Sequence, residues 1–153
     1  ESLWREGREV QLVLVGKQGW MVEALVDKLR LHPEQGRRLH WLEAIGDAVL
    51  ERLYEQASCL IAASEGEGFG LPLIEAAQHR LPILARDLRV FREVAGDHAT
   101  YFSGTDPEAL AGTLRTWLQL NLQGLHPPSD PMGWLTWRQS AEALASCLPL
   151  QAC

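Results

Sequence analysis

Two carboxylates enclose a glycine-rich turn in the stretch EGFGLPLIE, which runs from Glu67 to Glu75. Glycines permit positive φ and let a ligand approach backbone N–H groups. A helix that begins near Leu71-Pro72 presents free N–H groups and a dipole that favour an anion such as phosphate. Carboxylates accept hydrogen bonds from hydroxyls instead. A ligand with hydroxyls on both sides of a diphosphate satisfies both demands, and a nucleotide-sugar is such a ligand.

The same stretch also suits a helix start that binds nothing. A glutamate in the first turns of a helix is favoured by the dipole alone, by ~0.3–1 kcal/mol. Glycine turns between a strand and a helix are common in α/β folds. The chemistry of Glu67 and Glu75 by itself leaves both interpretations open.

Alternating apolar runs and helical patterns predict the elements that must position this turn. Short apolar runs predict five strands, at residues 10–15, 38–42, 58–63, 81–85 and 99–103. Helical spacing, prolines and caps predict six helices, at residues 21–31, 48–56, 71–79, 90–94, 107–120 and 133–148. This alternation indicates an α/β fold, a Rossmann-like, mostly parallel sheet flanked by helices.

Three finer expectations follow from the same patterns. The run Val10–Val15 is apolar throughout, which suits a strand covered on both faces. Asp47 is a suitable cap for the helix that follows it. A nucleotide-binding domain is expected over residues 1–123, followed at 124–153 by a Pro-rich linker and a terminal helix that packs back on the domain.

Composition limits the class of protein. The chain has 153 residues, of which 46% are hydrophobic and 22% charged, with a formal net charge of −6. An acidic globular protein is a poor partner for nucleic acid. No signal peptide or membrane span is recognisable, so a cytoplasmic location is expected, with peripheral attachment at the inner face of the membrane as an option for a longer protein. Three cysteines without a CxxC motif, Cys59, Cys147 and Cys153, suggest buried free thiols.

The segment EGEGFGLPLIEAAQHRLPILARD resembles the Glu-x7-Glu signature of retaining glycosyltransferases of family four, which have the GT-B fold. The segments VQLVLVGKQGW, LHWLEAIGDAVLERLYEQASCLIAAS, VFREVAGDHATYF and DPEALAGTL are similar to other parts of that family. The resemblance covers nearly the whole chain and implies the C-terminal, donor-binding half of a GT-B enzyme.

The resemblance also implies roles for the residues of the turn. Glu67 corresponds to the carboxylate that contacts the transferred sugar, and it is the catalytic candidate. Glu75 corresponds to the residue that binds the ribose hydroxyls. Contacts to the sugar and diphosphate are implied for the glycine turn itself, at Gly68, Phe69, Gly70 and Leu71.

Two further loops are candidates for donor binding. Gly16 and Lys17 end the first strand, from where Lys17 could reach the diphosphate; a solvated turn lysine is the alternative. Leu42 and Ile45 occupy the place where relatives hold the base, and plain core packing is equally compatible. The tryptophans, Trp20 and Trp137 among them, are expected to pack in the core or between helices.

The reaction implied is transfer of a sugar from a nucleoside diphosphate to a hydroxyl acceptor with retention, without a metal or other cofactor. The sequence GKQGW resembles bacterial mannosyl- and rhamnosyltransferases of surface-polysaccharide assembly, so GDP-mannose is the expected donor. A non-enzymatic nucleotide-sugar-binding module and a GT-B-type sugar-nucleotide epimerase are the alternatives.

Several parts of the family pattern are missing from this chain. They are the first strand of the domain, the Arg/Lys pair that follows it and the acceptor-binding N-terminal half, which would receive a glycan or lipid-linked acceptor. This chain alone is therefore expected to transfer no sugar. Strands left unpaired by the missing first strand are expected to promote self-association.

Overall fold

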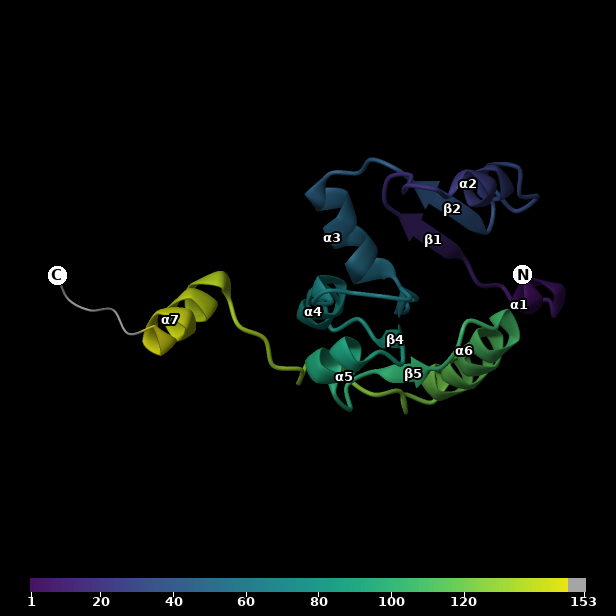
Figure 1. The fold of residues 1–153 in the computed structure, drawn as a ribbon. Coiled ribbons are helices and arrows are strands. Elements are labelled where there is room, and N and C mark those ends of the chain that lie inside the picture. The colour runs from purple at the N-terminus through teal and green to yellow at the C-terminus, as the bar shows by residue number, and fades with distance from the viewer. Residues whose placement is uncertain (149–153) are drawn as a thin grey trace.

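The computed structural model describes residues 1–148, which form parallel strands flanked by helices (Figure 1). The strands are β1 (Leu12–Val15), β2 (Leu39–Leu42), β3 (Leu60–Ala62), β4 (Ile83–Arg86) and β5 (Thr100–Phe102). The helices are α1 (Ser2–Arg5), α2 (Glu23–Arg30), α3 (Asp47–Gln56), α4 (Leu71–Gln78), α5 (Arg89–Ala95), α6 (Pro107–Leu122) and α7 (Trp137–Cys147). The expected α/β class and all five expected strands are confirmed.

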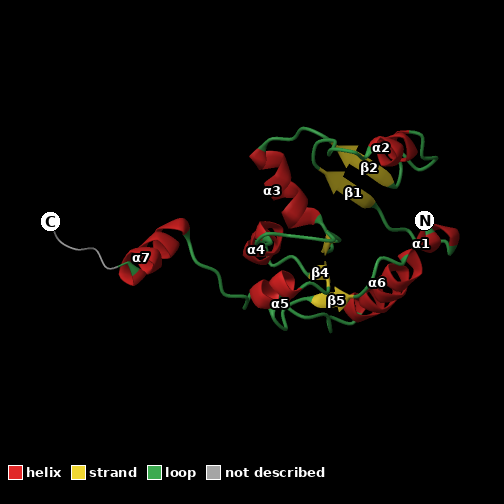
Figure 2. Ribbon diagram, viewed as in Figure 1, coloured by secondary structure: helices red, strands yellow, loops and turns green. Residues whose placement is uncertain are grey.

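The strands form two separate parallel sheets (Figure 2). In the first, β1 pairs with β2, with Leu12 opposite Leu39. In the second, β4 lies between β3 and β5. Within residues 1–148, β1 and β3 each pair on one side only, as expected for a sheet that lacks the strand between them. We call β1, β2 and α2 the two-stranded layer, and β3–β5 with α4–α6 the three-stranded layer.

The hydrophobic core belongs almost entirely to the three-stranded layer. Its larger cluster includes Leu73 and Ile83, and a smaller one contains Leu84, Phe102 and Trp117. Burying such side chains stabilises a fold by about 1.5–3 kcal/mol each. The strand β4, which carries Ile83, Leu84 and the buried Ala85, is thus the centre of the structure.

The expectation that the first strand is covered on both faces is wrong for the described residues. Val13 and Val15 are 39% and 46% exposed, while the alternate residues of β1 are half-buried. Tryptophan packing is likewise only partly as expected: Trp117 is buried, but Trp20 and Trp137 are 90% and 86% exposed.

Backbone chemistry explains why β4 begins two residues later than expected. After α4, Arg80 adopts a left-handed φ of 56°. The Arg80 N–H then donates to the carbonyl of Ala77 at 3.0 Å, and the Leu81 N–H donates to that of Ala76 at 2.9 Å. This is the Schellman arrangement that closes a helix. Leu81 therefore ends the helix instead of opening the strand.

Two helices also begin differently from what the sequence predicts. Gly46 precedes α3 with no side-chain cap, and Asp47 is the first helical residue instead of the cap. The last helix begins at Trp137, four residues later than expected, because Thr136 forms a capping box with Gln139. Asp106 does cap α6, by accepting from the Ala109 N–H at 3.1 Å.

The terminal helix does not pack back on the domain as expected. Figure 1 shows α7 standing away from the sheets and the other helices, and none of its residues is buried. The linker that precedes it does contact the core, because Met132 is buried and Ser129 donates to the Leu81 carbonyl at 2.9 Å.

Candidate functional site

The glycine turn leads from β3 into α4 at the carboxyl edge of the three-stranded layer, where ligands bind in open α/β sheets. Gly70 is the N-terminal boundary of α4, with φ of 89°. A Cβ at Gly70 would lie 3.2 Å from Cδ1 and Cε1 of Phe91, a buried core side chain. Both the backbone conformation and the close approach of Phe91 therefore require glycine at this position.

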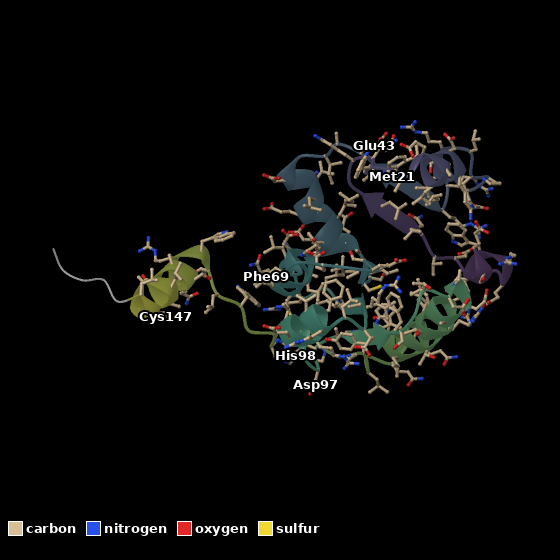
Figure 3. All side chains as sticks on the ribbon, viewed as in Figure 1. Met21, Glu43, Phe69, Asp97, His98 and Cys147 are labelled. Atoms are coloured by element: carbon tan, nitrogen blue, oxygen red, sulfur yellow. The ribbon has the colours of Figure 1, made fainter. Side chains whose placement is uncertain are left out.

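The backbone N–H groups that follow the turn are open to a ligand. Within residues 1–148, those of Phe69, Gly70 and Leu71 donate to no protein acceptor. Pro72 occupies the first turn of α4, where no N–H is needed. The side chains of Phe69 and Leu71 are 57% and 49% exposed, and Figure 3 shows Phe69 at the surface of the domain. The turn thus combines unused donors with the positive end of a helix dipole.

The two motif glutamates have different surroundings. Glu67 is exposed on the turn, and its Oε1 accepts only the neighbouring Gly68 N–H, at 3.0 Å. Glu75 is half-buried on α4, and its Oε2 accepts the hydroxyl of Tyr54 at 2.8 Å. Glu67 is free to reorient toward a ligand, whereas Glu75 is held by a neighbouring helix.

Tyr54 is a contact that the sequence analysis missed. It comes from α3, and its ring packs against the larger core cluster. Burial, and secondly the hydrogen bond to Glu75, raise the pKa of Tyr54 well above its usual value. The sequence did contain a signal for this contact, because Tyr54 lies on the inward face of an amphipathic helix. A buried phenol normally needs a hydrogen-bond partner.

Arg86 is a second residue that the sequence did not reveal. At the end of β4, its Nε donates to the Ser64 carbonyl at 2.9 Å and its Nη2 to that of Ala63 at 3.0 Å. Its Nη1 donates to the carbonyl of Gly104, and its guanidinium lies 5.1 Å from the centre of the Phe102 ring. Arg86 thereby ties the start of the glycine turn to β5.

The other candidates lie at the carboxyl edge of the two-stranded layer. The Gly16 N–H donates to the Leu42 carbonyl at 3.1 Å, and the Trp41 indole donates to the Gly16 carbonyl at 2.9 Å. Lys17 is exposed and forms no ion pair with any described residue. Leu42 and Ile45 are half-buried, which is compatible with both base binding and core packing.

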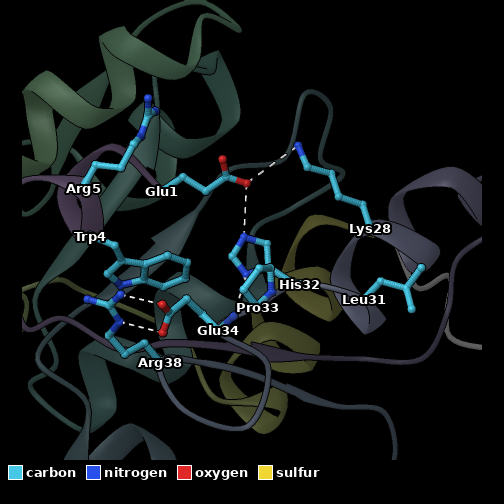
Figure 4. Close-up of a pocket in the computed structure, with 9 residues that line it drawn as sticks. All are labelled: Glu1, Trp4, Arg5, Lys28, Leu31, His32, Pro33, Glu34 and Arg38. Atoms are coloured by element: carbon cyan, nitrogen blue, oxygen red, sulfur yellow. Dashed lines mark hydrogen bonds and ion pairs between the residues drawn. The ribbon is translucent and has the colours of Figure 1, made fainter.

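A groove away from the glycine turn is shown in Figure 4. It measures about 530 Å³ and lies between α1, the end of α2 and the segment before β2. Its walls include Trp4, His32 and an ion pair in which Arg38 donates to Glu34 at 2.6 Å. Because α2 ends and β2 begins there, the groove lies at the amino edge of the two-stranded sheet, opposite the edge that carries Gly16 and Lys17.

The two cysteines within residues 1–148, Cys59 and Cys147, are both free thiols. Burial raises the pKa of the Cys59 thiol to about 12, so it stays protonated and is a poor nucleophile. Cys147 is free but exposed, contrary to the expected burial, and lies on α7 (Figure 3). Cys153 lies outside the described residues. Among residues 1–148, no three His, Cys, Asp or Glu side chains gather as a metal site would require.

None of the described helices has the length and apolar character needed to cross a membrane.

Comparison with known proteins shows the family. The family model described as glycosyl transferases group 1 matches residues 1–126. A serotype-specific mannosyltransferase WbdA of Escherichia coli is 53% identical over 152 residues, which is 99% of this chain but 19% of the relative. The O-antigen chain mannosyltransferase B of E. coli is 31% identical over 111 residues, covering 71% of this chain and 28% of the relative.

The fold also matches a solved structure. The pneumococcal O-GlcNAc transferase GtfA, crystallised with UDP and GlcNAc, superposes with a TM-score of 0.72 at 18% identity. The superposition covers 95% of this chain and 30% of GtfA. At that identity the likeness concerns the fold alone. The chain therefore spans about a fifth of the length of the WbdA relative and about a third of the GtfA chain.

Proposed function

This chain belongs to the group 1 family of glycosyl transferases, and from that membership we propose that it is the donor-binding part of a longer enzyme. The enzyme transfers a sugar from a nucleoside diphosphate to a hydroxyl acceptor with retention of configuration, in cell-surface polysaccharide synthesis. Mannose is the proposed sugar and GDP-mannose the proposed donor. The observation that carries this choice is the 53% identity to a mannosyltransferase over 99% of the chain.

In this proposal the glycine turn binds the phosphates. The N–H groups of Phe69, Gly70 and Leu71 have no protein acceptor among the described residues, and they lie at the start of α4. An anion there is stabilised by the helix dipole and by direct hydrogen bonds. Lys17, exposed at the end of β1, adds positive charge for the departing diphosphate.

The two glutamates divide the remaining work. Glu75, already held as a hydrogen-bond acceptor by Tyr54, binds the ribose hydroxyls. Glu67, exposed on the turn beside Gly68, contacts the transferred sugar and acts as the catalytic carboxylate. Leu42 and Ile45 form an apolar edge for the base, and Gly16 lets the nucleotide approach the end of β1.

Substitution of each glutamate tests these roles in the full-length protein. Glu75→Gln should weaken binding of the bare nucleotide by ~1.5–3 kcal/mol, because the ribose hydroxyls lose a charged acceptor. Glu67→Gln should leave nucleotide binding nearly unchanged while lowering turnover of the sugar-bearing donor. Glu65→Gln is the matched control, since Glu65 is exposed in the same loop but out of register with the motif. Calorimetry with equal affinity for wild type and Glu75→Gln would contradict the ribose role.

The proposed chemistry requires no metal, since backbone N–H groups and Lys17 supply the positive field for the diphosphate. Turnover by the full-length enzyme should then survive chelation. Complete loss of activity in EDTA that Mg²⁺ or Mn²⁺ restores would contradict this part of the proposal.

The partners follow from the same reaction. The acceptor is a glycan or lipid-linked saccharide bound by an N-terminal domain outside this chain, and no nucleic acid takes part. The enzyme is proposed to work in the cytoplasm, at the inner face of the membrane. This chain alone binds donor without transferring sugar and associates with a second copy through the unpaired edges of β1 and β3.

A further inference from the structure

The hydroxyl of Tyr54 connects the core to the proposed ribose site. It reaches Glu75 across 21 positions of sequence, from α3 to α4, with 2.8 Å between the phenol oxygen and Oε2. The Tyr54 ring stacks on His79 with 5.4 Å between ring centres and 8° between the planes. His79 is the residue directly after α4, one helical turn beyond Glu75. Core packing on one side and His79 on the other therefore fix where the hydroxyl points.

We propose that Tyr54 is a positioning residue, whose hydroxyl holds Oε2 of Glu75 so that the carboxylate presents its remaining lone pairs to the two ribose hydroxyls. This inference rests on the proposed role of Glu75. An ionised carboxylate has about four acceptor positions, and Tyr54 occupies one of them. Among the described residues no donor reaches Oε1, which is left for a ligand.

The benefit of this arrangement is preorganisation. A glutamate side chain has three rotatable bonds, and binding a diol through it costs the freedom of those rotors. A partner that fixes the carboxylate before the ligand arrives removes that cost from the binding step. Because the hydroxyl of Tyr54 stays protonated, it serves as a donor to the carboxylate throughout the neutral range.

The contribution of Tyr54 is measurable as nucleotide affinity in the full-length protein. GDP, UDP and ADP are titrated by calorimetry, and the one that binds wild type tightest is used throughout. Tyr54→Phe keeps the ring and its stacking on His79 but removes the donor. We expect the affinity to fall about three- to tenfold, which is the cost of immobilising one side chain during the binding step.

A double-mutant cycle separates positioning from general stability. If Tyr54 acts through Glu75, the Tyr54→Phe change should have no effect on affinity in a protein that already carries Glu75→Ala. The 2′,3′-dideoxy form of the same nucleotide should likewise bind Tyr54→Phe and wild type equally. Equal losses in both backgrounds, or for both nucleotides, would overturn the positioning role.

Tyr101→Phe is the matched control. Tyr101 is the second of the two tyrosines in the chain, and its hydroxyl donates to the carbonyls of Phe91 and Gly96. Its removal deletes a comparable hydroxyl without touching Glu75, so nucleotide affinity should stay at the wild-type value.

The inference and the proposed function fail in different ways. If Glu75→Ala binds the nucleotide as tightly as wild type, or if none of the three nucleotides binds, the proposed function fails and the role of Tyr54 with it. If Glu75→Ala weakens binding and Tyr54→Phe does not, only the positioning role is overturned.

Discussion

The two sheets of this protein differ in what holds them together. In the three-stranded layer, β4 has a partner on both sides and its residues Ile83, Leu84 and Ala85 are buried. The two-stranded layer has one strand pair, and the buried apolar side chains before residue 60 are Leu3, Val26 and Leu39. The three-stranded layer is thus stabilised by its own core, whereas the two-stranded layer buries few apolar side chains.

This difference divides the proposed site. The motif residues Glu67 and Glu75 stand on elements of the layer that has a core, whereas Lys17, Leu42 and Ile45 stand on the other. The part that needs exact geometry for hydrogen bonds is therefore placed on the stable layer. The residues proposed to supply charge and apolar contact stand on the layer with fewer buried side chains.

The largest expected effect concerns the unpaired edges of β1 and β3. The 153-residue chain in isolation should associate with itself, because β1 and β3 each pair on one side only and Val13 and Val15 are exposed. Sedimentation should show a mass that rises with concentration. The prediction would be contradicted by a monomer at every concentration whose β1 amides are as protected from hydrogen exchange as those of β4. Such a result would mean that the two layers are equally stable.

Core truncation should affect the layers very unequally. Leu73 is fully buried, so Leu73→Ala should cost about 2–5 kcal/mol of unfolding free energy. Val13→Ala, at a site 39% exposed, should cost less than about 1 kcal/mol. Chemical denaturation measures both, and similar costs would show that the layers share one core.

Removal of Arg86 should loosen the glycine turn from its layer. Arg86→Ala leaves the carbonyls of Ala63, Ser64 and Gly104 without their donor, for a loss of about 1–3 kcal/mol. Nucleotide affinity should fall as well, because the turn begins at these residues. Arg89→Ala is the control at an exposed arginine of the neighbouring helix. Unchanged stability and affinity in Arg86→Ala would show that the turn holds its shape unaided.

The smallest effect separates a packed helix from a detached one. Asp106→Ala removes the cap of α6, a helix with buried Ala111 and Trp117, and should lower the unfolding free energy by about 1 kcal/mol. Thr136→Ala removes the cap of α7, which buries nothing, so global unfolding of the chain should stay within about 0.5 kcal/mol of wild type. Equal effects would indicate that α7 packs on the domain.

The sequence by itself determined the α/β class, the positions of the strands along the chain and the place of the glycine turn. These depend on local signals: apolar runs, the proline at the start of α4, and glycines at positions that need positive φ, as at Gly70. The resemblance added the family, which the comparisons confirmed. Each of these signals involves only a few neighbouring residues, so it can be recognised from the sequence alone.

Tertiary structure decided the rest, because it depends on residues far apart in the chain. The contact of Tyr54 with Glu75 and the hydrogen bonds of Arg86 join different elements, and no local pattern encodes a pairing over some 20 residues. The exposure of Val13 could not be predicted from the sequence either. An apolar run indicates a strand but does not indicate whether a neighbouring element covers it. Local propensity fixes the elements, and only their packing decides which side chains meet.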